Sequence, residues 1–186
     1  MSHRTIKLLA CFSLVVMLVV ACGERKETGL EKNTADGLVL NAYKQKDDPL
    51  LLALADSLGK IGAISEPKSY YWRAYASDKT NKKRAAEYYW KKSGSAVTDF
   101  RYAEDVEYYA KSASRLANLK YVKGDYEGAM QFAIPAVEKL EELHCDTTSD
   151  YINLLIFIGC SQTHFANTAE STTHNFERAY NKHLEH

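Results

Sequence analysis

The C-terminal third of the chain contains cysteine and histidine residues that could bind a metal ion or form a disulfide. Cys160 and His164 stand four residues apart, as on one face of a helix, and His144-Cys145 lies upstream. Zinc prefers thiolate and imidazole ligands, but a structural zinc site needs four convergent ligands at a compact spacing. The spacing here fits no such motif, so we expect no metal site. Cys145 and Cys160 could instead form a disulfide in an oxidising compartment, or both could be buried free thiols.

Motifs typical of enzymes are missing from the sequence. It contains neither a Gly-x-Ser-x-Gly nucleophile motif nor a glycine-rich phosphate-binding loop. The acidic runs around Glu104 and Glu141 fall in helical patterns, where such runs are typical of solvated faces. We therefore expect that the protein is not an enzyme and needs no cofactor.

An apolar run that ends at Cys22 predicts a cleaved signal segment. The run covers residues 8–20, and two positive charges precede it. A helix that spans a membrane needs about 20 apolar residues, so this run is short for a permanent anchor. Val19-Val20-Ala21-Cys22 resembles the lipobox of bacterial lipoproteins. The resemblance implies a signal peptide over residues 1–21, lipid such as palmitate on Cys22, and a membrane-anchored place in the bacterial envelope, either periplasm-facing or in the outer membrane.

Composition after the signal segment favours one helical domain. Residues 22–186 carry 22 basic and 24 acidic side chains, a balance that does not favour a nucleic-acid partner. Ala, Lys, Glu, Leu and Tyr dominate after residue 49, and the chain has only three prolines. We expect an all-α fold without strands.

Apolar periodicity and turn signals divide the chain into elements. Residues 22–36 are charged and lack an apolar period, which predicts a flexible tether, and residues 37–186 predict a helical domain. A short helix would place Leu38, Leu40 and Tyr43 against a core. Further helices are predicted over about 49–59, 67–77, 84–92, 100–122, 126–144 and 151–165, with a last helix lined by Phe176, Ala179, Tyr180 and Leu184. Pro135 should kink the helix that contains it.

Small residues recur at a long spacing. Ala74 and Ala117 are 43 residues apart, and so are Ala86 and Ala129. With the turn Gly124-Asp125-Tyr126, this pattern resembles the tetratricopeptide repeat (TPR). The resemblance implies antiparallel helix pairs stacked as a short α-solenoid, here with a spacing longer than the usual 34 residues. The apolar stripe up to Leu184 has no polar capping helix after it, so we expect a domain that is incomplete at its C-terminus or docks onto a partner.

The resemblance also indicates a binding surface. In the TPR family the first helix of each pair lines a concave surface on which extended peptides lie. That mapping places these residues on it: Tyr71 and Tyr75 from one pair, Lys111, Arg115, Asn118 and Tyr121 from the next, and Asn153, Ile156 and Cys160 from the third. Lys111, Arg115 and Asn118 resemble part of the clamp with which some members hold a peptide carboxylate. The alternative is a solvated helix face above core tyrosines.

These observations favour a lipid-anchored scaffold that binds a protein or peptide partner. A second hypothesis is the truncated periplasmic sensory region of a two-component sensor histidine kinase, since some of these kinases contain such repeats. A third is a glycan-binding lipoprotein, in which the clustered Tyr and Trp side chains would stack on sugar rings.

Overall fold

Helices make up all the regular structure in the part of the chain that the structure describes. The computed structural model describes residues 29–165 and 169–184, with side chains from Asn33 onward. The expected all-α class is confirmed. The helices are α2 (Gly29–Lys44), α3 (Asp48–Lys60), α4 (Glu66–Lys79), α5 (Lys83–Ala96), α6 (Ala103–Tyr121), α7 (Tyr126–Glu142), α8 (Ser149–Gln162) and α9 (Ala169–Leu184).

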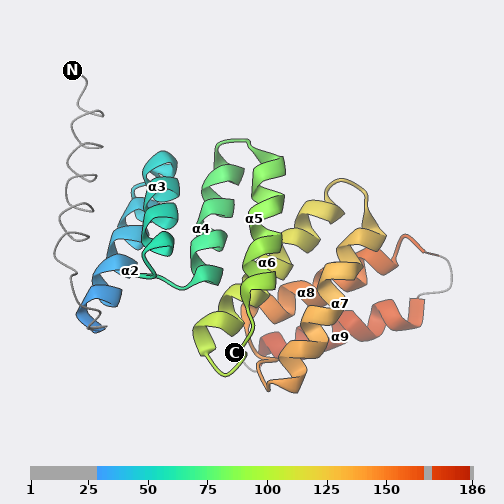
Figure 1. Ribbon diagram of the computed structural model, residues 1–186. Helices are drawn as coiled ribbons and strands as arrows, with labels where there is room; N and C mark the ends of the chain where they lie inside the picture. The colour runs from blue at the N-terminus through green and yellow to red at the C-terminus, as the bar shows by residue number, and fades with distance from the viewer. Residues whose placement is uncertain (1–28, 166–168, 185–186) are drawn as a thin grey trace.

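The helices stack in chain order as a solenoid (Figure 1). Each helix packs against the next one along the chain, and α6 also contacts α4 and α8, the first helices of the neighbouring pairs. The turns inside the pairs are short, with residues 80–82 between α4 and α5 and residues 122–125 between α6 and α7. The loops between pairs are longer, over residues 97–102 and 143–148. This arrangement places α4, α6 and α8 side by side.

Capping residues explain where two of the second helices begin. Asp47 is the N-cap of α3 and accepts a hydrogen bond from the backbone N–H of Leu50 (3.1 Å), and Pro49 follows in the first turn. Asp125 accepts from the N–H of Gly128 (2.9 Å). Gly124 has φ +76°, a conformation that glycine adopts without steric cost, so it turns the chain between α6 and α7. The predicted turn at this place is confirmed.

Small side chains let neighbouring helices approach closely. Ala74, Ala117, Ala86 and Ala129, which defined the 43-residue spacing, are all 0% exposed. The largest core cluster joins α6, α7, α8 and α9. α7 runs as one helix through Pro135.

Three local predictions were wrong. α2 begins at Gly29, so much of the expected tether is helical, because Ala35, Val39 and Ala42 form a stripe that packs against α3. Leu40 and Tyr43, expected in the core, are 44% and 39% exposed. α5 continues through residues 93–95, where the Ser93 hydroxyl donates a hydrogen bond to the Pro67 carbonyl (2.8 Å) and ties α5 to α4.

A buried lysine joins three helices. Lys68 on α4 is 8% exposed, and its Nζ lies 2.8 Å from a carboxylate oxygen of Asp36 on α2 and 2.8 Å from one of Glu104 on α6. Burial acts to lower the pKa of Lys68, but the two carboxylates outweigh it and the pKa is raised. Lys68 is therefore charged at neutral pH and links three successive first helices.

Candidate ligand-binding face

The first helices of three pairs contribute to one polar surface. α4 supplies Tyr71 and Tyr75, α6 supplies Lys111 and Arg115, and α8 supplies Asp150, and electrostatic interactions couple these residues across the helices. We call this surface the α4–α6–α8 face. The spacing of four residues between Lys111 and Arg115 places both on one side of α6.

Arg115 is the exposed cation of this face. Its guanidinium interacts with Tyr71 and Tyr75 on α4 and with Asp150 on α8. Burial of part of the side chain acts to lower the pKa of Arg115, but the tyrosines and the acid raise it overall. A guanidinium presents a planar fork of donors that fits a carboxylate, so Arg115 can bind an anionic group.

Lys111 is already paired on its own helix. Its Nζ forms an ion pair with Glu107, one turn earlier, and also lies 5.4 Å from the centre of the Tyr108 ring. The two cations expected to hold a carboxylate therefore differ. Glu107 neutralises the charge of Lys111, whereas the side chain of Arg115 is exposed.

Asp150 is a residue of this face that the sequence analysis missed. Burial raises the pKa of Asp150, although Lys111 and Arg115 act to lower it. Glu107 and Asp150 are 43 residues apart, the same spacing as the alanine pairs, and this was the signal that could have identified both acids. With two cations and two acids the face is close to neutral, so an incoming carboxylate would compete with Asp150 for Arg115.

An aromatic ladder borders Arg115. Tyr75 packs edge-on against Tyr43 of α2, with ring centres 5.3 Å apart, and against Trp72 at 5.8 Å. Tyr71 continues the ladder to Tyr108 of α6 at 5.3 Å, but it is only 6% exposed. Tyr71 therefore contributes its hydroxyl end beside Arg115, whereas Tyr75 is partly exposed and Tyr43 is exposed.

Asn118 and Tyr121 extend the row toward the C-terminal end of α6. Both side chains are partly buried. Tyr121 packs edge-on against Tyr126, with ring centres 5.4 Å apart, and Tyr126 in turn stacks on His164 at 3.6 Å with the rings nearly parallel. Cys160 interacts with the hydroxyl of Tyr121. Tyr121 thus belongs to an aromatic cluster that joins α6 to α8, separate from the ladder around Tyr75.

Cys145 and Cys160 do not pair. Both are free thiols, and the disulfide considered from the sequence is not formed. Cys145 lies in the loop before α8, whereas Cys160 lies about three turns along α8, a rise of roughly 17 Å from the start of the helix at Ser149. A disulfide requires Cα atoms about 4.4–6.8 Å apart. Among the described residues no group of three or more His, Cys, Asp or Glu side chains could hold a metal ion.

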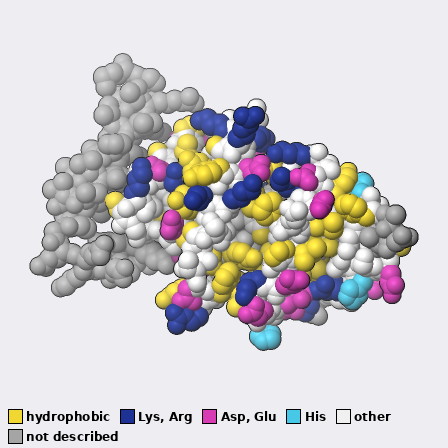
Figure 2. All heavy atoms as spheres, turned by 45° about the vertical axis from the view of Figure 1, so that its right-hand side comes forward, with side chains coloured by type: hydrophobic (Ala, Val, Ile, Leu, Met, Phe, Trp, Pro, Cys, Tyr) yellow, Lys and Arg dark blue, Asp and Glu magenta, His cyan; other side chains and the backbone are white. Residues whose placement is uncertain are grey.

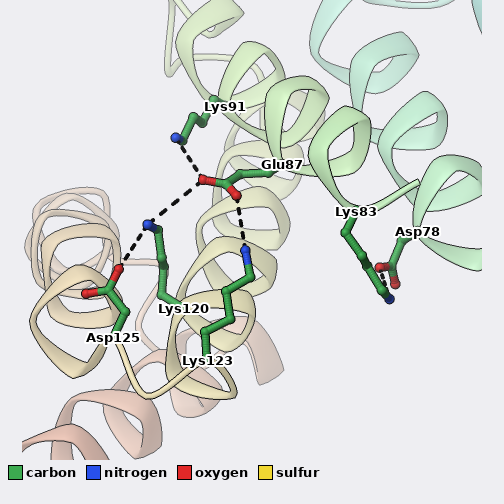
Figure 3. Close-up of polar contacts among 7 residues, drawn as sticks. All are labelled: Asp78, Lys83, Glu87, Lys91, Lys120, Lys123 and Asp125. Carbon is green, nitrogen blue, oxygen red and sulfur yellow. Dashed lines mark hydrogen bonds and ion pairs between the residues drawn. The ribbon is translucent and has the colours of Figure 1, made fainter. Parts of the chain in front are cut away.

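A second polar cluster surrounds Glu87 on α5 (Figure 3). Its carboxylate interacts with Lys91 Nζ at 3.0 Å, Lys123 Nζ at 3.4 Å and Lys120 Nζ at 4.0 Å. Lys120 also pairs with Asp125 at 2.9 Å. The lysine contacts, of which the hydrogen bond from Lys91 is the strongest, lower the pKa of Glu87 against the effect of burial. The cluster joins α5 to the α6–α7 turn and leaves one cation in excess.

Charge is unevenly distributed on the surface. On the face drawn in Figure 2, Lys and Arg side chains gather mainly toward the upper border, Asp and Glu are dense at the lower border, and hydrophobic side chains lie between them. The turns inside the pairs and the helix ends next to them carry Lys79, Lys82, Lys83, Lys120 and Lys123. The opposite ends of α6 and α7 carry Glu104, Asp105, Glu138, Glu141 and Glu142.

Cys22 lies outside the described residues. Within the described part, no helix has the length and apolar character that a membrane span requires. The sequence matches no protein-family model and no curated protein.

Proposed function

We propose that the protein is a TPR-like scaffold that binds an extended peptide or protein segment on its α4–α6–α8 face. The supporting observation is the position of Arg115, which is exposed on α6 between Tyr75 of α4 and Asp150 of α8. The first helices of three successive pairs thus contribute groups around one cation. An extended ligand that crosses these helices meets an aromatic ladder on one side and an acid on the other.

The ligand chemistry follows from these groups. Arg115 fits a carboxylate, either of a peptide C-terminus or of an acidic side chain, by charge-assisted hydrogen bonds. The rings of Tyr75 and Tyr43 fit an apolar or aromatic side chain next to that carboxylate. Asp150 weakens the attraction of Arg115 for an anion, which favours a transient interaction.

A pair of peptide libraries tests this function. N-acetylated random hexapeptides are prepared once with a free C-terminal carboxylate and once as C-terminal amides, and their binding to the full chain in detergent is measured by mass spectrometry of the retained peptides. We expect retention of carboxylate peptides with an aromatic residue near the C-terminus. Arg115→Gln should reduce retention roughly tenfold, the loss expected for a charge-assisted contact.

The control for this experiment is Lys92→Gln, which removes an exposed cation on α5. It should leave retention unchanged. Equal retention of carboxylates and amides, or binding that survives Arg115→Gln, would show that the face does not act in this way.

We further propose that Cys22 carries lipid and holds this scaffold at a bacterial membrane. The support is the sequence Val19-Val20-Ala21-Cys22 after a short apolar run. Metabolic labelling with palmitate should mark the wild-type chain, and Cys22→Ala should abolish the label and leave residues 1–21 attached. Labelling of the variant at the wild-type level would reject the anchor.

A further inference from the structure

The α8–α9 pair carries an open apolar groove. The groove has a volume of about 510 Å³, and its walls include Ile152, Asn153 and Ile156 of α8 and Phe176, Tyr180 and His183 of α9. The described residues that line it include no Asp, Glu, Lys or Arg. All of these lining residues belong to α8 and α9.

The repeat shows what covers such a groove. The residues of α7 that stand 43 positions before Phe176, Ala179, Tyr180 and His183 are Ala133, Ala136, Val137 and Leu140. These four are at most 4% exposed, and they form one core with α8. One repeat earlier, Trp90 and Ser93 of α5 and Val97 just after it are at most 8% exposed, and α6 packs on α5. At this position of the repeat, a helix with an apolar stripe covers both α5 and α7.

α9 itself carries an apolar stripe like those of the helices that cover α5 and α7, and this stripe is exposed. Its exposed apolar side chains Phe176, Tyr180 and Leu184 are spaced by four residues, and they are 37%, 63% and 66% exposed. Phe176 and Tyr180 of this stripe also form one wall of the groove, so the groove and the stripe belong to one continuous apolar face of α8 and α9. A surface that offers both elements can pair with a copy of itself about a two-fold axis.

We infer that two copies of this chain associate through their α8–α9 faces, with α9 of each copy lying in the groove of the other. The lack of full charges in the groove favours this occupant, because two identical faces meet there without like-charge repulsion. Tyr180, the more exposed aromatic ring of the groove, lies near the middle of the contact.

Sedimentation equilibrium of the full chain in a density-matched detergent tests the association. We expect the average mass to rise from that of one copy toward that of two copies as the protein concentration increases to about 100 µM. A dissociation constant in this range is that of a weak specific complex. Tyr180→Glu and Ile156→Glu each place a charge in the contact and should weaken the association at least roughly tenfold, as central interface residues do. Both positions are exposed, so the fold should remain, as circular dichroism will verify.

Tyr88→Glu is the matched control. Tyr88 is 55% exposed on α5, away from the groove, so this variant should associate like the wild type. A chain that stays monomeric at the highest concentration would overturn the inference, even if it bound an amphipathic helix from another protein. Association that Tyr180→Glu and Ile156→Glu leave unchanged would also overturn it, because the contact would then lie elsewhere.

Discussion

Lys68 Nζ lies 2.8 Å from the Glu104 carboxylate and thereby joins α4 to α6 across 36 residues of sequence. The same ammonium group holds Asp36 of α2 at 2.8 Å. One buried charge thus fixes the spacing of three first helices, and it lies on the element that also carries Tyr71 and Tyr75.

Lys68→Ala should lower the free energy of unfolding by about 1–3 kcal/mol, because it removes the buried ammonium group that both carboxylates contact. Lys60→Ala is the matched control, since Lys60 pairs with Asp56 at 2.6 Å but its side chain is 72% exposed. That change should cost less than about 0.5 kcal/mol. Urea unfolding followed by circular dichroism measures both variants, and equal losses would contradict a structural role for the Lys68 link.

Asp150→Asn should stabilise the fold and strengthen the binding of carboxylates at neutral pH. Burial raises the pKa of Asp150 in the folded chain. The ionised carboxylate therefore destabilises the fold at a pH above that pKa. This cost disappears once the pH is below the pKa that Asp150 has in the unfolded chain. The melting temperature of the variant should exceed that of the wild type at pH 7, and the two should converge toward pH 4. Asp56→Asn, at an acid that pairs with the exposed Lys60, should bring no such gain. A variant less stable than the wild type at pH 7 would show that the contact with Arg115 outweighs burial.

Glu87→Gln should have the opposite pH dependence. The lysines lower the pKa of Glu87 in the folded chain. The carboxylate therefore stabilises the fold at a pH above the pKa that Glu87 has in the unfolded chain. This contribution is lost as the pH falls through the pKa of Glu87 in the folded chain. We expect the variant to be less stable by about 0.5–1 kcal/mol at pH 7, and we expect this deficit to be smaller at about pH 3, in urea titrations at both pH values. The exposed Glu138→Gln should show little difference at either pH. A deficit for Glu87→Gln that persists in acid would have to come from packing.

Two glycines should respond differently to alanine. A Cβ on Gly59 would lie 2.2 Å from Ser69 Oγ and 2.5 Å from Ser69 Cβ, so Gly59→Ala should force α3 and α4 apart and cost about 1–3 kcal/mol. Gly94 lies inside α5, where an added Cβ would meet no neighbouring atom within 4 Å, and Gly94→Ala should gain about 0.5–1 kcal/mol. Thermal unfolding of the two variants checks the contrast. A gain for Gly59→Ala would mean that the α3–α4 contact can widen without cost.

Local chemistry allowed much of the fold to be predicted from the sequence. Some signals act within a few residues, such as Asp and Pro at helix starts and Gly124 in its turn. Others recur at a regular spacing, such as the alanines 43 residues apart. Both kinds can be recognised without a structure. The start of α2 was missed because its buried residues are Ala35, Val39 and Ala42, of which only one is a large apolar side chain.

Tertiary packing decided how the candidate site is built. The sequence placed Lys111 and Arg115 on one face of a helix, but only the approach of α8 brings Asp150 to Arg115, and only the packing of α4 on α6 buries the ring of Tyr71. Exposure, charge compensation and pKa depend on neighbours that are distant in the chain. Helical periodicity fixes which side of an element a residue occupies, whereas the helices packed against that side decide whether the residue is free to bind.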